Sequence, residues 1–350
     1  MITASYLKRT LIFKFPAGTS RGVLRQKDVF YLLLFDKENG SKKGIGEIAP
    51  VPGISPDAVP ELEEKIQSLV QKINAGNEIQ ESEFAGFPSV SFGYETALKG
   101  LISESPVLLY PSDFTSGKAG IPINGLIWMG SKDFMVQQVE EKLAAGFTCL
   151  KLKIGVDFNA ELEILRSIRK RFPADKLEIR VDANGAFSAE NALKNLEQLA
   201  KYKLHSIEQP ILHGQIEAMK KFCAETPLPI ALDEEITGIT GLDKKKKLLD
   251  QIKPQYIILK PSLTGGIKAS EEWINIAREL GIGWWVTSAL ESNIGLNAIA
   301  QWTATLGSTN FQGLGTGALF TNNIESPLFV SKGNLFCSAE KRWNFENLEQ

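Results

Sequence analysis

Five charged residues stand at nearly constant spacing in the chain, each at the end of a short apolar run. They are Lys153, Asp182, Glu208, Asp233 and Lys260, and the gaps between them are 29, 26, 25 and 27 residues. Because one strand, one helix and two loops together take about 30 residues, the spacing predicts five consecutive strand–helix units. In a parallel α/β barrel, the C-terminal ends of such strands are where catalytic residues gather.

The three carboxylates in this series predict a site for a divalent metal ion. Asp182, Glu208 and Asp233 come from adjacent predicted strands, so a barrel brings them together. Without a cation, the pKa values of the three would rise and the fold would lose stability. Mg²⁺ prefers such oxygen ligands and keeps positions open for water and substrate. The alternative is that the three carboxylates only cap neighbouring helices, but lysines in the same register favour the metal.

The lysines on either side predict proton chemistry. Lys151 and Lys153 alternate with Leu152, so both point to one face of their strand, which in a barrel is the interior. Mutual repulsion and a nearby dication both lower a lysine pKa, so one of the two becomes a base near neutral pH. Lys260 lies four strands further on and approaches from the opposite side. Such a site suits removal of a proton α to a carboxylate, with the enediolate held by the metal.

Composition excludes several other classes of protein. The chain has 350 residues, 43% of them hydrophobic and 23% charged, and a formal net charge of -2. This balance is typical of a soluble globular protein and gives no electrostatic case for nucleic acid. No signal peptide or long apolar run is present, so we expect a cytoplasmic protein that contacts no membrane. With only two histidines, a Ser-His-Asp triad or a histidine-rich zinc site is disfavoured. The basic run 244–247 is interpreted as a solvated helix face.

The chain divides into two parts with different patterns. Strands at 6–15, 29–36 and 45–49, followed by helices at 56–74 and 90–104, predict an N-terminal α+β unit. In the second part strands alternate with helices, which favours a closed α/β barrel. The predicted barrel strands lie near 121–127, 149–153, 178–182, 204–208, 229–233, 256–260, 284–288 and 310–314.

These patterns predict the domain boundaries. We expect an N-terminal α+β domain at 1–115 and a catalytic barrel at 116–325. The last stretch, 326–350, is too short for a full eighth helix and is expected to return to the N-terminal unit. The fold class is therefore α/β, a modified TIM barrel of the (β/α)7β kind with an N-terminal α+β domain. Between its first two strands, 14–25 is interpreted as a mobile loop that closes over the barrel mouth.

The charged motifs, taken in order, resemble the enolase superfamily and in particular its muconate-lactonizing subgroup. The matching motifs are K-x-K at 151–153, D-x-N with Asp182 and Asn184, E-Q-P at 208–210, D-E at 233–234 and K-P-x-x-x-G-G at 260–266. The resemblance covers essentially the whole chain. It implies a capping domain at the N-terminus and Mg²⁺ on the three carboxylates, with Mn²⁺ as a substitute.

Further segments are similar to o-succinylbenzoate synthases. They are GIGEIAPVPGIS at 44–55, FPSVSFGYETAL at 87–98, Arg180, SALESNIGL at 288–296 and GLGTGALFTNN at 313–323. Dipeptide epimerases of the subgroup usually carry Asp-x-Asp at the eighth strand, which this chain lacks. An N-acylamino acid racemase or dipeptide epimerase remains the alternative. A non-catalytic barrel is disfavoured because every ligand and base position is filled.

The resemblance implies a reaction and roles for individual residues. The reaction is the syn dehydration that forms o-succinylbenzoate in menaquinone biosynthesis, acting on a small carboxylate substrate. Lys153 is expected to abstract the α-proton and to protonate the departing hydroxyl, with Lys151 beside it, while Lys260 stabilises the enediolate as a cation. The candidate substrate-binding residues are Arg180, Asn184, Ser262 and Ser288. The two serines are equally interpreted as strand-end hydroxyls that satisfy backbone groups. The oligomeric state is not indicated by the sequence.

Overall fold

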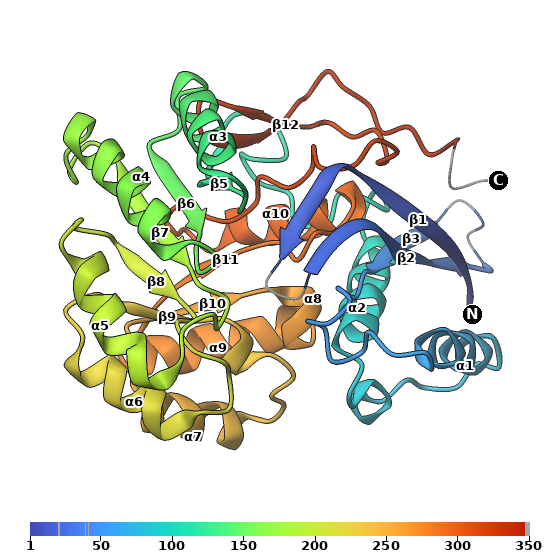
Figure 1. Cartoon of the computed structure of the whole chain (residues 1–350). Helices are drawn as coiled ribbons and strands as arrows, with labels where there is room; N and C mark the ends of the chain where they lie inside the picture. Colours follow the sequence, from blue (N-terminus) through green and yellow to red (C-terminus); the bar gives the residue numbers. More distant parts are fainter. Residues whose placement is uncertain (20–21, 39, 41, 347–350) are drawn as a thin grey trace.

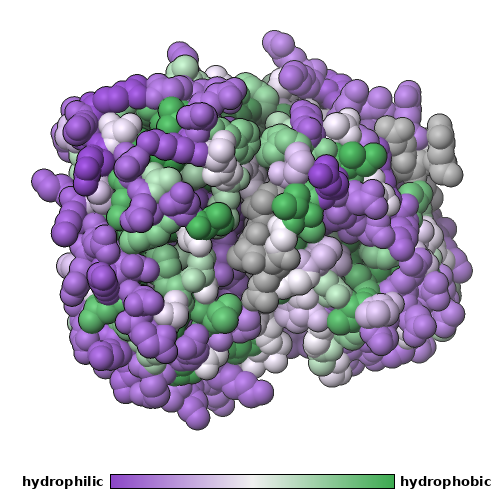
Figure 2. Space-filling model, in the orientation of Figure 1, coloured by the Kyte–Doolittle hydropathy of each residue, from purple (hydrophilic) through white to green (hydrophobic). Residues whose placement is uncertain are grey.

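The chain folds into an N-terminal sheet unit beside a curled parallel sheet surrounded by helices (Figure 1). The computed structural model describes residues 1–350 except 20, 21, 39, 41 and 347–350. Figure 2 shows that hydrophilic residues cover most of this face, with smaller patches of apolar residues among them. In the described part of the chain, no helix is both long and apolar enough to cross a membrane.

The N-terminal unit is a three-stranded antiparallel sheet with two helices against one face. Its elements are β1 (Ile2–Thr19), β2 (Gly22–Asp36), β3 (Lys43–Ile48), α1 (Leu62–Asn74), the short 3-10 helix η1 (Glu81–Phe84) and α2 (Pro88–Ile102). The predicted α+β pattern is confirmed, but the first helix begins at Leu62 instead of residue 56. Prolines at 52, 56 and 60 explain the delay, because the residue before a proline avoids helical backbone angles.

The segment predicted as a loop at 14–25 continues both strands of a hairpin. β1 and β2 stay paired to their ends, with Ala17 opposite Leu24 and Thr19 opposite Gly22. Residues 20 and 21 lie outside the described part of the chain. The prediction of a loop over the whole of 14–25 is therefore wrong, because 17–19 pair with 22–24 beyond a register shift between Ile12 and Ala17.

The second unit contains the predicted parallel sheet. It has seven strands in the order β11-β10-β9-β8-β7-β6-β5. The strands are β5 (Gly125–Ile127), β6 (Cys149–Lys153), β7 (Glu178–Asp182), β8 (Ser206–Glu208), β9 (Ile230–Leu232), β10 (Tyr256–Leu259) and β11 (Gly283–Val286). The helices are α3 (Lys132–Ala144), α4 (Phe158–Arg171), α5 (Ala189–Ala200), α6 (Ile216–Glu225), η2 (Glu234–Ile236), α7 (Leu242–Ile252), α8 (Pro261–Thr264), α9 (Ile267–Glu279) and α10 (Asn293–Thr305). The chain therefore alternates strand and helix at the predicted interval.

The two edges of this sheet are joined by an irregular segment instead of a regular eighth strand. Gln312 forms a parallel bridge with Ile123, and Gly313 forms one with Thr287. A side chain at Gly313 would lie 2.1 Å from the Thr287 hydroxyl, so only glycine permits this approach. The strand predicted at 310–314 is therefore reduced to two bridges, because glycine is a weak strand former and pairs here only locally.

The strand predicted at 121–127 divides into two. β4 (Ile121–Pro122) pairs with β13 (Asn334–Cys337), which in turn pairs with β12 (Leu328–Ser331), while β5 joins the large sheet. The chain after this C-terminal hairpin places Trp343 and Phe345 against the apolar cluster that holds Leu11 and Phe13 of β1. The C-terminal segment thus contacts both units, as Figure 1 shows for the red trace at the top.

The basic run at 244–247 is not wholly a solvated face. Lys245 in α7 is buried, with its ammonium 2.7 Å from a carboxylate oxygen of Glu272 and over the ring of Trp273. It precedes the buried Leu248 and Leu249 by three and four residues, so it shares their face of the helix. The prediction is wrong for this lysine, because helical periodicity turns it toward the core.

Glycines permit the close packing of β3 on α2. A Cβ added to Gly44 would lie 1.9 Å from the Ala97 carbonyl oxygen, and one added to Gly46 would lie 1.8 Å from that of Gly93. A Cβ on Gly93 would in turn lie 2.4 Å from the side chain of Ile48. Since neither backbone can yield without moving its whole element, these glycines set the distance between helix and sheet.

Gly46→Ala is predicted to lower the free energy of unfolding by about 3 kcal/mol, because the methyl group must displace the backbone of α2. Urea denaturation measures the change. Gly40→Ala is the control, because a Cβ there has no atom within 4 Å. Equal stability of the two variants would contradict this account of the packing.

Candidate active site

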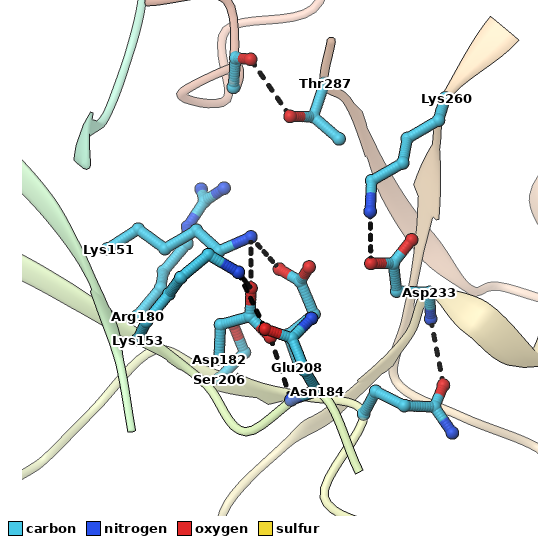
Figure 3. A network of polar contacts seen from close by, with 12 residues as sticks. Lys151, Lys153, Arg180, Asp182, Asn184, Ser206, Glu208, Asp233, Lys260 and Thr287 are labelled. Carbon is cyan, nitrogen blue, oxygen red and sulfur yellow. Dashed lines mark hydrogen bonds and ion pairs between the residues drawn. The ribbon is translucent and has the colours of Figure 1, made fainter. Parts of the chain in front are cut away.

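The parallel register brings the predicted charges to one end of the sheet. Lys153 in β6 is the register partner of Asp182 in β7, and Asp182 is that of Glu208 in β8. Asp233 and Lys260 directly follow β9 and β10. Figure 3 shows Lys153 entering from one side of the site and Lys260 from the other, with the carboxylates between them.

The charged side chains form direct ion pairs. The Lys151 ammonium lies 2.9 Å from Asp182 Oδ2 and 2.5 Å from Glu208 Oε2. Lys153 donates to Asp182 Oδ2 at 3.1 Å and to the side-chain oxygen of Asn184 at 2.7 Å. Lys260 donates to Asp233 Oδ2. Each carboxylate of the predicted metal site therefore contacts at least one ammonium group.

These pairs decide the protonation of the buried groups. Burial alone would lower the pKa of Lys151, but the charges of Asp182 and Glu208 outweigh it and raise that pKa. Burial also acts against the ammonium of Lys260, and Asp233 likewise outweighs it, so the pKa of Lys260 is raised. Lys151 is therefore held as an ammonium by its two carboxylate partners.

The carboxylates respond in different ways. Burial alone would raise the pKa of Asp182, but the charges of Lys151 and Lys153 lower it overall. Burial, followed by the charge of Asp182, raises the pKa of Glu208 well above its usual range. Burial and the neighbouring Asp233 raise the pKa of Glu234 to about 7. Of these three carboxylates, Asp182 is thus the one most firmly held in its charged form.

The donor set suits a hard cation, although the side chains are not arranged around one. Among the described residues, no three Asp, Glu, His or Cys side chains stand in a metal-binding arrangement. Lys151 and Lys260 hold the carboxylates instead. Glu208 Oε1 and Glu234 Oε2 are nevertheless buried with no hydrogen-bond partner in the described structure. Buried oxygens of this kind need a positive partner, so the residues fit a divalent ion once the lysines turn away.

A cavity of about 580 Å³ opens at this end of the sheet. Its polar lining consists of Asn124, Gln138, Glu141, Lys142, Lys151, Lys153, Asp182, Asn184, Glu234, Lys260, Thr287, Ser288 and Thr316. Its apolar lining includes Val51 and Ile54 from the N-terminal unit together with Leu126, Trp285, Ala289 and Leu290. The cavity is therefore large enough for a small carboxylate and draws its walls from both units.

The four residues predicted to bind substrate occupy different places. Asn184 and Ser288 line the cavity. The Ser288 hydroxyl lies 2.6 Å from that of Thr316. Ser262 is buried behind the wall, where its hydroxyl donates to Glu291 at 2.5 Å. Arg180 also lies away from the described lining.

Arg180 occupies the layer of the sheet interior below the site. Its guanidinium donates to the carboxylate of Glu178 at 2.7 Å and to the Phe311 carbonyl at 2.9 Å. It also lies 4.2 Å from the ring centre of Trp285, which lines the cavity from above. Because Arg180 precedes Asp182 by two residues on one strand face, it lies one layer deeper than the metal-binding candidates.

Gln209 is a site residue that the spacing of charges does not reveal. It is buried and has a left-handed backbone with φ of 39°. Its side-chain oxygen accepts the N–H groups of Asp233 and Glu235, and its amide donates to Ile211 and to the Glu235 carboxylate. It thereby ties the end of β8, which carries Glu208, to the end of β9. The E-Q-P motif was the only signal of this role.

Family models match both parts of the chain. Residues 134–337 match the model described as enolase C-terminal domain-like, and residues 16–101 match MenC, N-terminal domain. The o-succinylbenzoate synthase of Desulfotalea psychrophila is 47% identical over 95% of this chain and 98% of its own length. This chain belongs to the o-succinylbenzoate synthase family of the enolase superfamily.

Solved structures agree with this membership. The crystal structure of MenC from Desulfotalea psychrophila has a TM-score of 0.86 and 42% sequence identity, covering 96% of this chain and 99% of that one. A dipeptide epimerase from Enterococcus faecalis, complexed with Mg and a dipeptide, has a TM-score of 0.81 at 18% identity over 97% of each chain. The second likeness concerns the fold alone. The synthase family therefore spans both the N-terminal unit and the sheet that carries the charged site.

Gln209→Met is predicted to lower the free energy of unfolding by about 2–4 kcal/mol, because it leaves two buried N–H groups without an acceptor. Urea denaturation measures the loss. The exposed Gln215, which donates only to the Leu212 carbonyl, supplies the control Gln215→Met. If both variants keep wild-type stability, Gln209 does not join the strand ends.

Proposed function

We propose that this chain is an o-succinylbenzoate synthase. It removes water from 2-succinyl-6-hydroxy-2,4-cyclohexadiene-1-carboxylate to give o-succinylbenzoate, a step of menaquinone biosynthesis. The observation that carries this proposal is the 47% identity to a synthase over nearly the whole of both chains. The paired lysines facing a cavity with carboxylates at its base support the same chemistry.

Lys153 is the proposed base and acid. Its ammonium contacts Asp182 and Asn184 at the cavity wall, which aims it at a molecule bound there. As a neutral amine it takes the proton from the carbon next to the substrate carboxylate. It then returns this proton to the hydroxyl on the neighbouring ring carbon. The carbon–oxygen bond breaks, water leaves and the ring becomes aromatic, so one residue on one face completes a syn elimination.

Lys260 is proposed to act through its charge. Its raised pKa keeps the ammonium protonated at neutral pH, which suits stabilisation of a negative charge and not proton abstraction. Lys260 faces Lys153 across the site (Figure 3). The enediolate formed after proton removal therefore lies between Lys153, which has taken up the proton, and the ammonium of Lys260. Lys151, whose pKa is also raised, adds a second positive charge on the side of Lys153.

We propose Mg²⁺ as the cofactor, with Mn²⁺ as a substitute. Enolase-superfamily enzymes generally use Mg²⁺, and the buried unpaired oxygens described above suit such an ion. Asp182, Glu208 and Asp233 would hold it. Bound there, the ion would supply positive charge to the substrate carboxylate as that group gains electron density. Lys151 and Lys260 must then release their carboxylates and turn toward the substrate.

The fold is proposed to follow the modified barrel of this family in full. The bridges at Gln312 and Gly313 support closure of the seven-stranded sheet into a (β/α)7β barrel. We further propose a capping domain at 1–115, completed by 326–350, and a catalytic domain at 116–325. The packing of Trp343 against the apolar cluster that includes Leu11 and Phe13 of β1 supports the return of the C-terminal segment.

Lys153→Ala is predicted to abolish dehydration, with kcat falling at least about 1,000-fold, because Lys151 on the same face is held as an ammonium by Asp182 and Glu208. A spectrophotometric assay of o-succinylbenzoate formation measures this, and circular dichroism checks the fold. Lys201→Ala, at an exposed helix end, should keep full activity. Survival of activity in Lys153→Ala would disprove the assignment of the base.

Chelation of divalent ions is predicted to stop dehydration, and added Mg²⁺ should restore it, since the carboxylates need a cation to hold the substrate. Mg²⁺ should also raise the Tm of the wild type, because a ligand that binds only the folded state stabilises it. Asp233→Asn should remove most of this rise. Full activity after chelation would contradict the metal assignment.

Two assays on the wild-type protein distinguish a synthase from an N-acylamino acid racemase. We expect rapid formation of o-succinylbenzoate and no loss of the α-proton from N-succinyl amino acids in deuterium oxide. Proton nuclear magnetic resonance measures the exchange. Exchange without dehydration would identify a racemase and overturn the proposed function.

A further inference from the structure

A second group of buried charges lies between the two units, outside the proposed chemistry. It consists of Lys27 from β2, Glu47 from β3 and Glu291 from the loop between β11 and α10, and all three side chains are buried. Burial of an ammonium is costly, and it lowers the pKa of Lys27 although both glutamates act in the opposite direction. A lysine kept at such a position needs a compensating role.

Lys27 hydrogen-bonds to backbone carbonyls of both units at once. Its ammonium donates to Ala49 at 3.1 Å, directly after β3. It also donates to Leu290 at 3.0 Å and to Ala289 at 3.5 Å, in the loop after β11. In sequence, Ala49 precedes Ala289 by 289 − 49 = 240 residues. The ammonium of Lys27 therefore links the backbone after β3 to the loop after β11.

The segments that Lys27 joins continue directly into the cavity wall. Val51 and Ile54 follow Ala49 and line the cavity from the N-terminal unit. Ala289 and Leu290 line it from the other unit. Lys27 itself is not among the lining residues, so its removal takes away no direct contact with a bound molecule.

The two glutamates also form hydrogen bonds to the loop between β11 and α10 and to the start of α10. Glu47 accepts hydrogen bonds from the backbone of Ser292 and of Gly295, each at 2.7 Å, at the start of α10. Glu291 accepts the Ala289 N–H at 2.7 Å and the Ser262 hydroxyl at 2.5 Å. A carboxylate from β3 thus caps a helix of the other unit, where backbone N–H groups favour a negative charge.

Leu290 adopts a conformation that this loop alone does not favour. Its φ is 62°, in the left-handed region that branched and bulky residues rarely enter. Strain of this kind persists where the surroundings hold the residue, and it is common at binding sites. The hydrogen bond from Lys27 to the Leu290 carbonyl holds this peptide, together with the apolar packing of the Leu290 side chain, which lines the wall.

We propose that Lys27 is a positioning residue that fixes the wall shared by the two units and thereby sets the affinity for substrate. The proposal rests on the proposed function, because the wall is assigned to substrate through the cavity it bounds. Lys27 stands apart from the lysines at the cavity base, so it governs binding and leaves proton transfer unaffected.

The test compares Lys27→Met with the wild type in dehydration kinetics and in the binding of o-succinylbenzoate, followed by calorimetry. Methionine keeps the length and removes the donor. We expect KM and the dissociation constant of the product each to rise about tenfold, with kcat within about twofold of the wild type. Wild-type turnover of the cyclohexadiene is measured first, so that failure of the proposed function is recognised separately.

Lys245→Met is the matched control, since Lys245 is equally buried and donates to the Ala269 carbonyl and to Glu272, away from the cavity. It should lower the Tm while KM stays within about twofold of the wild type. Equal KM changes in the two variants, or a fall in kcat at constant KM for Lys27→Met, would overturn the proposal. If Lys27→Met does not fold, Lys27→Gln, whose donor is one atom shorter, replaces it with the same expected and contradicting results.

Discussion

The structure depends on the mutual neutralisation of buried charges at one end of the parallel sheet. Three ammonium groups and three carboxylates lie there within the sheet interior, where each alone would carry a large desolvation cost. Direct ion pairs offset that cost and leave Asp182 charged and Lys260 protonated. The same ion pairs hold in place the lysines and carboxylates that the proposed reaction needs.

The cavity at the charged end of the sheet is bounded by walls from both units, and the N-terminal unit supplies one of them. Its sheet is held on α2 by glycines that admit no side chain, so the position of β3 is fixed on that face. The opposite face of β3 presents Glu47 to the start of α10, and Lys27 beside it joins the backbones of both units. The packing of one face of β3 on α2 is thus linked to the position of the cavity wall beside its other face. We therefore expect a change in this packing to alter the cavity wall without changing the lysines of the site.

Much of the fold and of the site was predictable from local pattern. The bounds of β6 and β7 coincide with the predicted runs that end at Lys153 and Asp182, because buried apolar residues alternate with charged ones along both strands. The predictions failed where long-range packing overrode that pattern. The run at 310–314 lost regular strand structure to a close glycine contact with Thr287. Lys245 turned inward because the face of α7 that packs against the core includes it.

The sequence by itself determined which chemical groups stand at the strand ends, because strand periodicity and repeat length are local properties of the chain. It therefore determined the family and led to the proposed proton chemistry. Only the tertiary structure decided which charges neutralise one another and which side chains reach the cavity. Arg180 stacks on Trp285 below the site, and Lys27 meets carbonyls from a loop more than 200 residues away in sequence. Such pairings depend on how whole elements pack, and no spacing along the chain records them.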